Sequence, residues 1–165
     1  MAPTAACSSS AKCAGQRPRR RAAPLIAYID TSALIKLLVQ EDGSDLADEV
    51  WSRASSRFAN RLVYPEARAA LAAAQRSGRI DASSHRAAVK ELEGACASMQ
   101  LVGIDSELAI DAGDLAARYA LRGYDAVHLA TALSVDDADR ALVTWDRDLG
   151  SAAVAAGLAV VPKPG

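Results

Sequence analysis

The feature that most constrains the fold is an alternation, from residue 25 onward, of short apolar runs with longer stretches in which apolar residues recur every three or four positions. Short runs that lack a polar residue at every second position are typical of strands buried on both faces. We expect strands at 25–29, 57–60, 101–104, 141–145 and 158–161. We expect helices at 33–39, 44–51, 65–77, 81–99, 124–135 and 149–156, and a further helix that begins after Asp105 and is ended by Gly123. Strands separated by helices predict an α/β fold, a three-layer α/β/α arrangement around a central, mostly parallel sheet.

The length of 165 residues suits one compact domain, which we place at residues 25–165. Residues 1–24 contain five basic side chains, no acid and no hydrophobic periodicity, so we expect a flexible basic tail there. Taking these five from the totals of 19 basic and 20 acidic side chains leaves 14 against 20 in residues 25–165, a net charge of −6. An acidic domain lacks the general positive surface of nucleic-acid-binding proteins. Contact with nucleic acid is therefore expected only through bound cations or local basic patches.

Two further classes of protein are excluded by the sequence. No apolar run approaches the roughly 18–20 residues needed to cross a bilayer, so we expect no membrane partner. Cys7, Cys13 and Cys96 lack the paired spacing of a thiolate zinc site, and their number and scatter do not indicate a disulfide framework. We expect a cytoplasmic protein in a reducing environment.

Acidic residues follow several of the predicted strands. Asp30 and Asp146 come directly after apolar runs, and Asp105 follows a third. Ligands of parallel α/β sheets bind beyond the carboxyl ends of the strands, so these positions are candidates for chemistry. Asp105 precedes Ser106 and Glu107 and is better explained as an ordinary helix cap.

Two more acids, Glu66 and Asp125, lie within apolar or alanine-rich stretches near predicted helix starts. A favourable interaction with the helix dipole is one explanation for each of them. Asp125 is the more unusual, because it begins a helix that is apolar almost throughout. Buried carboxylates are costly unless they are paired or coordinated, so several at one sheet edge indicate a bound divalent cation. Ligand sets made only of oxygen favour Mg²⁺ or Mn²⁺.

Each of the neighbouring polar residues has a structural as well as a functional explanation. We expect the hydroxyls of Thr31 and Ser32 to cap the helix at 33–39, which leaves the Asp30 carboxylate without a structural explanation. His128 lies three residues after Asp125 and is expected to pack in the core or to support that carboxylate. Asp148 is either an auxiliary ligand or a solvated residue at a helix start. His85, Arg118 and Arg122 are expected to be solvated, although the two arginines are placed where they could meet phosphate.

Four sequence blocks carry a resemblance to a known family. They are YIDTSALIK at 28–36, LVYPEARAAL at 62–71, LRGYDAVHLATAL at 121–133 and LVTWDRDL at 142–149. Together they resemble a PIN-domain ribonuclease, specifically the VapC-type toxin of bacterial toxin–antitoxin pairs. The blocks occur in the order of the family, and the resemblance covers about residues 25–162. Pro65 and residues 1–24 depart from the family pattern without affecting any of the acids.

The resemblance implies a function and a set of site residues. Asp30, Glu66, Asp125 and Asp146 match the four acids that surround the Mg²⁺ site of the family, with Asp30 and Asp125 as the most direct ligands. The family hydrolyses the phosphodiester backbone of RNA, usually as a homodimer, and a small cognate antitoxin protein silences it. By resemblance, we expect a Mg²⁺-dependent ribonuclease that also accepts Mn²⁺ and acts as a toxin.

The alternatives belong to other classes. A dinucleotide-binding domain would need a glycine-rich turn after the first strand, and 30–33 contains no glycine. A phosphatase with an aspartyl nucleophile usually carries a second acid two residues on, where this chain has Ser32. The remaining alternative is a catalytically degenerate PIN-like or receiver-like signalling or binding module, which would tolerate loss of Glu66 and Asp146.

Overall fold

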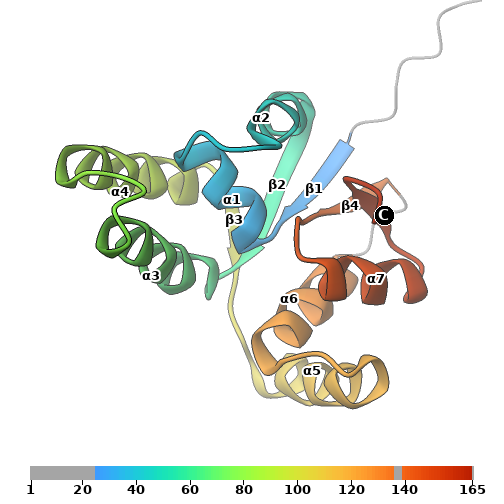
Figure 1. Cartoon of the computed structure of the whole chain (residues 1–165). Coiled ribbons are helices and arrows are strands. Elements are labelled where there is room, and N and C mark those ends of the chain that lie inside the picture. The colour runs from blue at the N-terminus through green and yellow to red at the C-terminus, as the bar shows by residue number, and fades with distance from the viewer. Residues whose placement is uncertain (1–24, 136–138, 165) are drawn as a thin grey trace, which may run out of the picture.

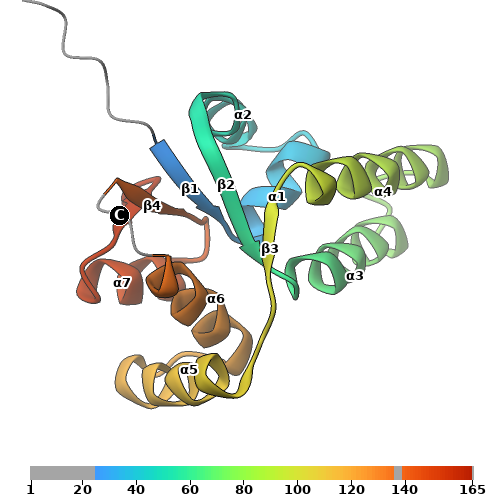
Figure 2. The same ribbon diagram turned by 180° about the vertical axis from the view of Figure 1, so that it is seen from behind.

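The structure is a computed structural model that describes residues 25–135 and 139–164. The predicted tail at 1–24 lies outside the described residues. Within them, a five-stranded sheet has the order β3-β2-β1-β4-β5, and each pair of neighbouring strands is parallel. Its strands are β1 (Leu25–Ile29), β2 (Ala54–Asn60), β3 (Gln100–Val102), β4 (Arg140–Val143) and β5 (Ala159–Val161). Figure 2 shows β3 at one edge of the sheet, from which the chain continues into α5.

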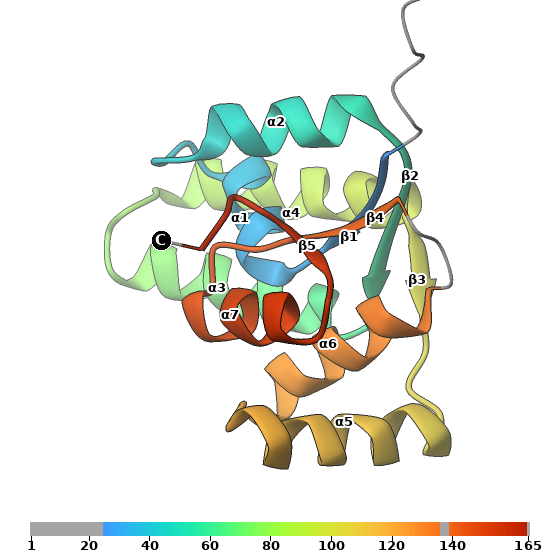
Figure 3. The ribbon, with the colours of Figure 1, turned by 90° about the vertical axis from the view of Figure 1, so that its right-hand side faces the viewer.

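Helices cover both faces of the sheet, which confirms the predicted three-layer α/β/α fold. The helices are α1 (Thr31–Leu38), α2 (Ser44–Arg53), α3 (Val63–Arg76), α4 (Ala82–Ala97), α5 (Ser106–Tyr119), α6 (Gly123–Ser134) and α7 (Arg147–Ala155). The first four lie on one side of the sheet and the last three on the other (Figures 1 and 3). No helix in the described part of the chain combines the length and the apolar character that a bilayer crossing requires.

The alternation of side chains along β1 explains the two layers. Ala27 and Ile29 point into a core shared with α1, α2, α3 and α4. Tyr28, between them, points the other way, into a core built largely from α6, α7 and β5. Since β1 is the middle strand and is buried on both sides, its carboxyl end lies at the centre of the molecule.

Several predicted helix boundaries were wrong by two or more residues, and two of them have a clear local cause. The first helix begins at Thr31 rather than Ala33, because Asp30 itself is the N-cap and accepts hydrogen bonds from the amides of Thr31 and Ser32. The fifth helix ends at Tyr119, where Ala120 adopts a left-handed conformation and the Leu121 amide bonds to the Ala116 carbonyl. Gly123, predicted to end that helix, is instead the first residue of α6.

Candidate active site

All four acids singled out from the sequence line one pocket of about 380 Å³. Asp30 follows β1, and Asp146 follows the adjacent strand β4, so the parallel pairing of these strands puts both at the same sheet edge. Glu66 and Asp125 lie in the first turns of α3 and α6. The structure therefore brings together residues that are up to 116 positions apart in the sequence.

Asp30 is the most enclosed of the four, with 5% of its surface exposed. Its Oδ1 accepts a hydrogen bond from the Thr31 amide. Its Oδ2 accepts from the Ser32 amide (3.2 Å), the Ser32 hydroxyl (2.6 Å) and the Thr144 hydroxyl (2.8 Å). The prediction that Thr31 and Ser32 cap the helix was wrong, because the Asp30 carboxylate accepts from both of their amides.

The two hydroxyls that hold Asp30 also fix the segment that carries Asp146. The Ser32 hydroxyl accepts a hydrogen bond from the Trp145 amide at 2.8 Å, and the Thr144 hydroxyl accepts one from the Asp146 amide at 3.0 Å. Asp146 Oδ1 in turn accepts from the Leu149 amide at 2.8 Å and caps α7. Asp30 and the loop after β4 are therefore positioned by one shared set of hydrogen bonds.

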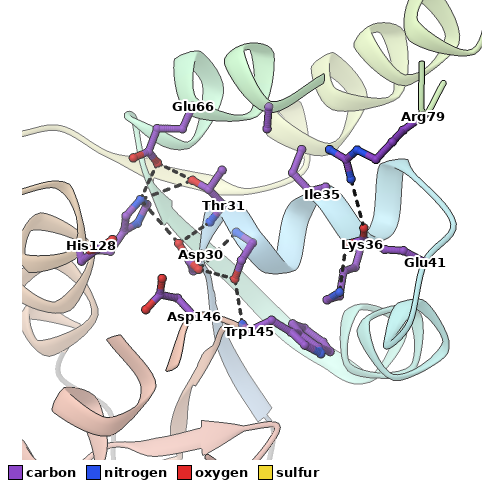
Figure 4. Close-up of a pocket in the computed structure, with 13 residues that line it drawn as sticks. Asp30, Thr31, Ile35, Lys36, Glu41, Glu66, Arg79, His128, Trp145 and Asp146 are labelled. Atoms are coloured by element: carbon purple, nitrogen blue, oxygen red, sulfur yellow. Dashed lines mark hydrogen bonds and ion pairs between the residues drawn. The ribbon is translucent and has the colours of Figure 1, made fainter. Parts of the chain in front are cut away.

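Glu66 is held by donors from two other elements. Its Oε2 accepts hydrogen bonds from the Thr31 hydroxyl and from His128 Nε2, the latter at 2.8 Å (Figure 4). Burial alone would raise the pKa of Glu66, but the hydrogen bonds from His128 and Thr31 hold it below its ordinary value. His128 is buried, which confirms the predicted packing in the core, and its ring supports Glu66 rather than Asp125.

The surroundings of Asp125 shift its pKa in the opposite direction from that of Glu66. Burial, followed by the negative charges of Asp146 and Asp30, raises the pKa of Asp125 above its ordinary value. No lysine or arginine in the described part of the chain forms an ion pair with any of the four acids. His128 Nε2 lies 2.8 Å from Glu66 Oε2 and 3.8 Å from Asp30 Oδ1; burial would lower the pKa of His128, but the Glu66 hydrogen bond and the nearby carboxylates raise it. Negative charge therefore accumulates at this end of the pocket, and the charge of Arg122 offsets it only in part, since the pKa of Asp125 is still raised.

This donor set fits a hard divalent cation, although the residues do not form a finished cage. Among residues 25–135 and 139–164, no three acid, histidine or cysteine side chains are arranged to hold a metal ion as they stand. Mg²⁺ typically keeps several waters and is bound by one or two carboxylates, so a cage made entirely of protein is not required. Asp125 carries a raised pKa beside two other carboxylates, and a bound cation would relieve that repulsion.

Other candidates from the sequence lie outside the pocket. Asp105 caps α5 by accepting from the Leu108 amide at 2.9 Å, which confirms the prediction. Asp148 is exposed in the first turn of α7 and is not a pocket-lining residue. Arg118 and Arg122 are exposed and do not line the pocket either. His85, predicted to be solvated, is partly buried on α4.

Sequence reasoning missed the basic end of the pocket. Lys36 Nζ lies 3.0 Å from Glu41 Oε1 and 5.2 Å from the centre of the Trp145 ring, and Arg79 lies 3.8 Å from Glu41 Oε2. Figure 4 shows these groups across the pocket from Glu66. A helical spacing of four residues from Ser32 could have placed Lys36 on the pocket face of α1. Nothing in the sequence could have placed Arg79 there.

Gly43, just before α2, also shapes the site, because it contacts Trp145, which lies far from it in the sequence. Its backbone has a φ of +91°, and a β-carbon built there would lie 2.5 Å from Trp145 Nε1. The Trp145 indole therefore packs directly against the glycine backbone. A side chain at position 43 would displace the residue that precedes Asp146.

Comparisons with known proteins agree with this geometry. The family model described as PIN domain matches residues 27–155. The chain is 44% identical over 139 residues to "Ribonuclease VapC45" and to "Ribonuclease VapC49", both of Mycobacterium tuberculosis, covering 84% of this chain and 96% of each relative.

Solved structures share the fold. A crystal structure of PAE2754 from Pyrobaculum aerophilum aligns with a TM-score of 0.62 and 25% identity, covering 83% of this chain and 84% of that one. Mycobacterium tuberculosis VapC20, described as a sarcin–ricin loop cleaving toxin, aligns with a TM-score of 0.59 and 17% identity, covering 76% of this chain and 94% of that one. On the family match and the identity to these relatives, the chain belongs to the PIN domain family and is similar to its VapC ribonucleases, as the four acid-bearing sequence blocks predicted.

Proposed function

We propose that this protein is a Mg²⁺-dependent ribonuclease that hydrolyses RNA phosphodiester bonds and acts as the toxin of a toxin–antitoxin pair. The observation that carries the proposal is the meeting of four carboxylates from four segments in one pocket, without a paired lysine or arginine among the described residues. The relatives at 44% identity are named ribonucleases, which supports the same activity.

Asp30, Asp125, Asp146 and Glu66 would hold the cation, with Mn²⁺ able to take the place of Mg²⁺. When bound, the ion supplies polarisation of a phosphoryl oxygen and a lowered pKa for an attacking water. The carboxylates position it at the sheet edge, where the net acidic domain otherwise repels phosphate. Substrate is therefore expected to bind poorly when the cation is removed.

Asp146 and Glu66 are the candidates to accept a proton from the attacking water. The hydrogen bonds from His128 and Thr31 keep the pKa of Glu66 low, so Glu66 retains its charge more readily than it accepts a proton. Asp146 is exposed, and its Oδ1 caps α7. We therefore assign the proton-accepting role to Asp146 and a charge-holding role to Glu66.

Asp125→Asn is the sharpest test of the activity. Asp125 receives no hydrogen bond from the described residues, so the amide removes charge without breaking a structural contact, unlike Asp30→Asn. Asp148→Asn is the matched control, because Asp148 is an exposed acid at a helix start outside the pocket.

Cleavage of a fluorescent RNA is measured with Mg²⁺, with Mn²⁺ and with EDTA. We expect a loss of at least about 100-fold for Asp125→Asn, since even residues that only support a ligand cost 10- to 100-fold. Asp148→Asn should cleave at the wild-type rate. Undiminished cleavage by Asp125→Asn, or full activity in EDTA, contradicts the proposal and favours the degenerate binding module.

The proposed partners follow from the acidic pocket. A small cognate antitoxin that places an arginine or lysine among the four carboxylates would neutralise them and block the substrate. A structural neighbour from Klebsiella pneumoniae is a toxin–antitoxin complex, with a TM-score of 0.53 and 21% identity, which supports an antitoxin partner. Co-expression with each neighbouring small reading frame should relieve toxicity for one of them, and unchanged toxicity with all of them counts against this partner. The proposed homodimer is tested by the mass measured in light scattering.

A further inference from the structure

The pocket that holds the four acids also has a positively charged end. Lys36 on α1 and Arg79, in the turn between α3 and α4, both line it. Figure 4 shows Arg79 and Glu66 on opposite sides of the pocket, with Ile35 between them. Glu41 lies between the two cations and offsets one of their charges. One positive charge therefore remains at this end, opposite the acids.

The protein itself uses the charge of Lys36. Its Nζ donates to Glu41 Oε1 at 3.0 Å and to the Asp42 carbonyl at 2.6 Å, and it lies over the Trp145 ring. The Lys36 side chain is only 11% exposed. This ammonium ties the segment after α1 back to the helix, and it has little capacity left for a ligand.

The guanidinium of Arg79, by contrast, keeps its donors free. Its side chain is 58% exposed, and its distance of 3.8 Å to Glu41 Oε2 is too long for a hydrogen bond. The guanidinium groups of Arg53, Arg57 and Arg68 each donate to a protein acceptor. That of Arg79 donates to none among the described residues, so the pocket contains a cation that is available to a ligand.

The backbone that carries this side chain is fixed. The Arg79 amide donates to the Ala74 carbonyl at 2.9 Å, and Gly78 supplies the left-handed turn after α3 with a φ of +74°. The next residue, Ile80, packs against the core shared with α1. Arg79 is therefore an exposed donor on a firmly held turn at the rim of the pocket.

A free guanidinium at this place fits a phosphate of the substrate, since arginine binds phosphate through two parallel hydrogen bonds. Along α1, the rise from Thr31 beside the acids to Lys36 at the basic end is about 7.5 Å. A stacked nucleic-acid strand has one phosphate per about 3.4 Å of its axis, so the two ends are one or two nucleotides apart. Ile35 and Ala70 line the pocket as well and offer apolar surface to a nucleoside.

We propose that Arg79 binds a phosphate of the RNA one or two nucleotides from the scissile bond, so that the strand lies across α1 from the acids to the turn between α3 and α4. The proposal rests on the proposed function and states how the same pocket holds its substrate. This phosphate does not react, so its contact with Arg79 is equal in the ground state and the transition state. Loss of the contact should therefore change KM rather than kcat.

The first test measures RNA binding without cleavage. Fluorescence anisotropy of a labelled single-stranded RNA is followed with Mg²⁺ in an Asp146→Asn background, which removes the proposed proton acceptor. We expect Arg79→Gln to weaken binding about tenfold at low salt and to make the slope of log Kd against log salt shallower by about 0.7, the share of one phosphate in a single strand.

Arg76→Gln is the matched control for both measurements. Arg76 is an exposed arginine in the last turn of α3, three positions before Arg79, and it does not line the pocket. It should bind RNA within about twofold of its parent. Equal Kd values for the Arg79→Gln and Arg76→Gln variants, at equal unfolding midpoints, overturn the proposal.

The second test uses cleavage by chains with an intact Asp146. Arg79→Gln should raise KM about tenfold and change kcat less than about twofold. A lowered kcat with an unchanged KM overturns the proposal. A wild-type chain that binds RNA through Arg79 but does not cleave it contradicts the proposed function and leaves this contact standing.

The third test locates the phosphate. In the binding assay, single phosphates of the RNA are replaced in turn by uncharged methylphosphonates. At one position within two nucleotides of the cut, the replacement should weaken binding as much as Arg79→Gln does, and the two changes together should weaken it no further. Losses that multiply at every such position overturn the proposal.

Discussion

The contact between Gly43 and Trp145 leads to a quantitative prediction for Gly43→Ala. An alanine there keeps a left-handed φ of +91°, which costs about 1–2 kcal/mol for a residue with a β-carbon. Its β-carbon would also lie 2.5 Å from Trp145 Nε1 and 2.9 Å from Cε2, so the indole must move. Overpacking of this kind costs about 1–3 kcal/mol. We expect Gly43→Ala to lower the free energy of unfolding by about 2–5 kcal/mol.

Gly78→Ala is the matched control for this prediction. Gly78 also has a left-handed φ of +74°, but no heavy atom lies within 4 Å of the β-carbon position. It should lose only the conformational part, about 1–2 kcal/mol. Urea unfolding of both variants measures the difference, which isolates the contact with Trp145.

RNA cleavage should also be impaired more by Gly43→Ala than by Gly78→Ala. The Trp145 amide donates to the Ser32 hydroxyl, which holds Asp30, so displacement of the indole disturbs the acidic pocket. Cleavage per folded molecule should fall for Gly43→Ala and stay constant for Gly78→Ala. Equal destabilisation by the two substitutions would refute the reasoning. The reasoning would also be refuted if Gly43→Ala lowered the free energy of unfolding by as much in a Trp145→Leu background, where the indole is absent, as in the wild type.

Three further outcomes are expected. In EDTA, Asp125→Asn should unfold at a higher urea concentration than the wild type. Burial and the charges of Asp146 and Asp30 raise the pKa of Asp125 and so disfavour its ionised form, which the asparagine removes. A lower urea midpoint for Asp125→Asn would contradict the accumulation of negative charge in the pocket. Mg²⁺ at 100 times its Kd should stabilise the wild type by about 2.7 kcal/mol and Asp125→Asn much less, as thermal unfolding would show. Asp81→Ala should be less stable than the wild type at neutral pH, since the Ser84 amide lowers the pKa of this helix cap below 3.8. Because the lowered pKa stabilises the folded state only while Asp81 is ionised, that difference should shrink as the pH falls and Asp81 becomes protonated, and a difference that does not change with pH would exclude the Asp81 charge as its source.

The sequence predicted the parts of the site that depend on local pattern. Apolar runs that end at Asp30 and Asp146 identify strand ends, and parallel pairing then brings the two to one edge. Glu66 and Asp125 stood out because they interrupt alanine-rich or apolar helices, and both line the pocket as expected. The weak strand signal at 57–60 understated β2, which runs from Ala54 to Asn60 and includes serines and an arginine that apolar patterning does not detect.

What the sequence could not predict depends on contacts between distant segments. The three-residue spacing suggested that His128 supports Asp125, but the path of α6 past β1 turns its ring toward Glu66. Ala120 ends α5 in a left-handed conformation that usually selects glycine, so the prediction that Gly123 ends this helix was wrong. Arg79 reaches the pocket only because α3 and α4 pack beside α1, which no local pattern encodes.

The pairing of β1 with β4 has a consequence for biosynthesis. Ile29 is in register with Val143, so one side of the pocket is missing until the ribosome has produced β4 and the segment that follows it. A nascent chain that already carries Asp30, Glu66 and Asp125 still lacks Asp146 and the threonine that clamps Asp30. On the proposed function, we therefore expect a nascent chain that ends before Asp146 to be unable to cleave RNA.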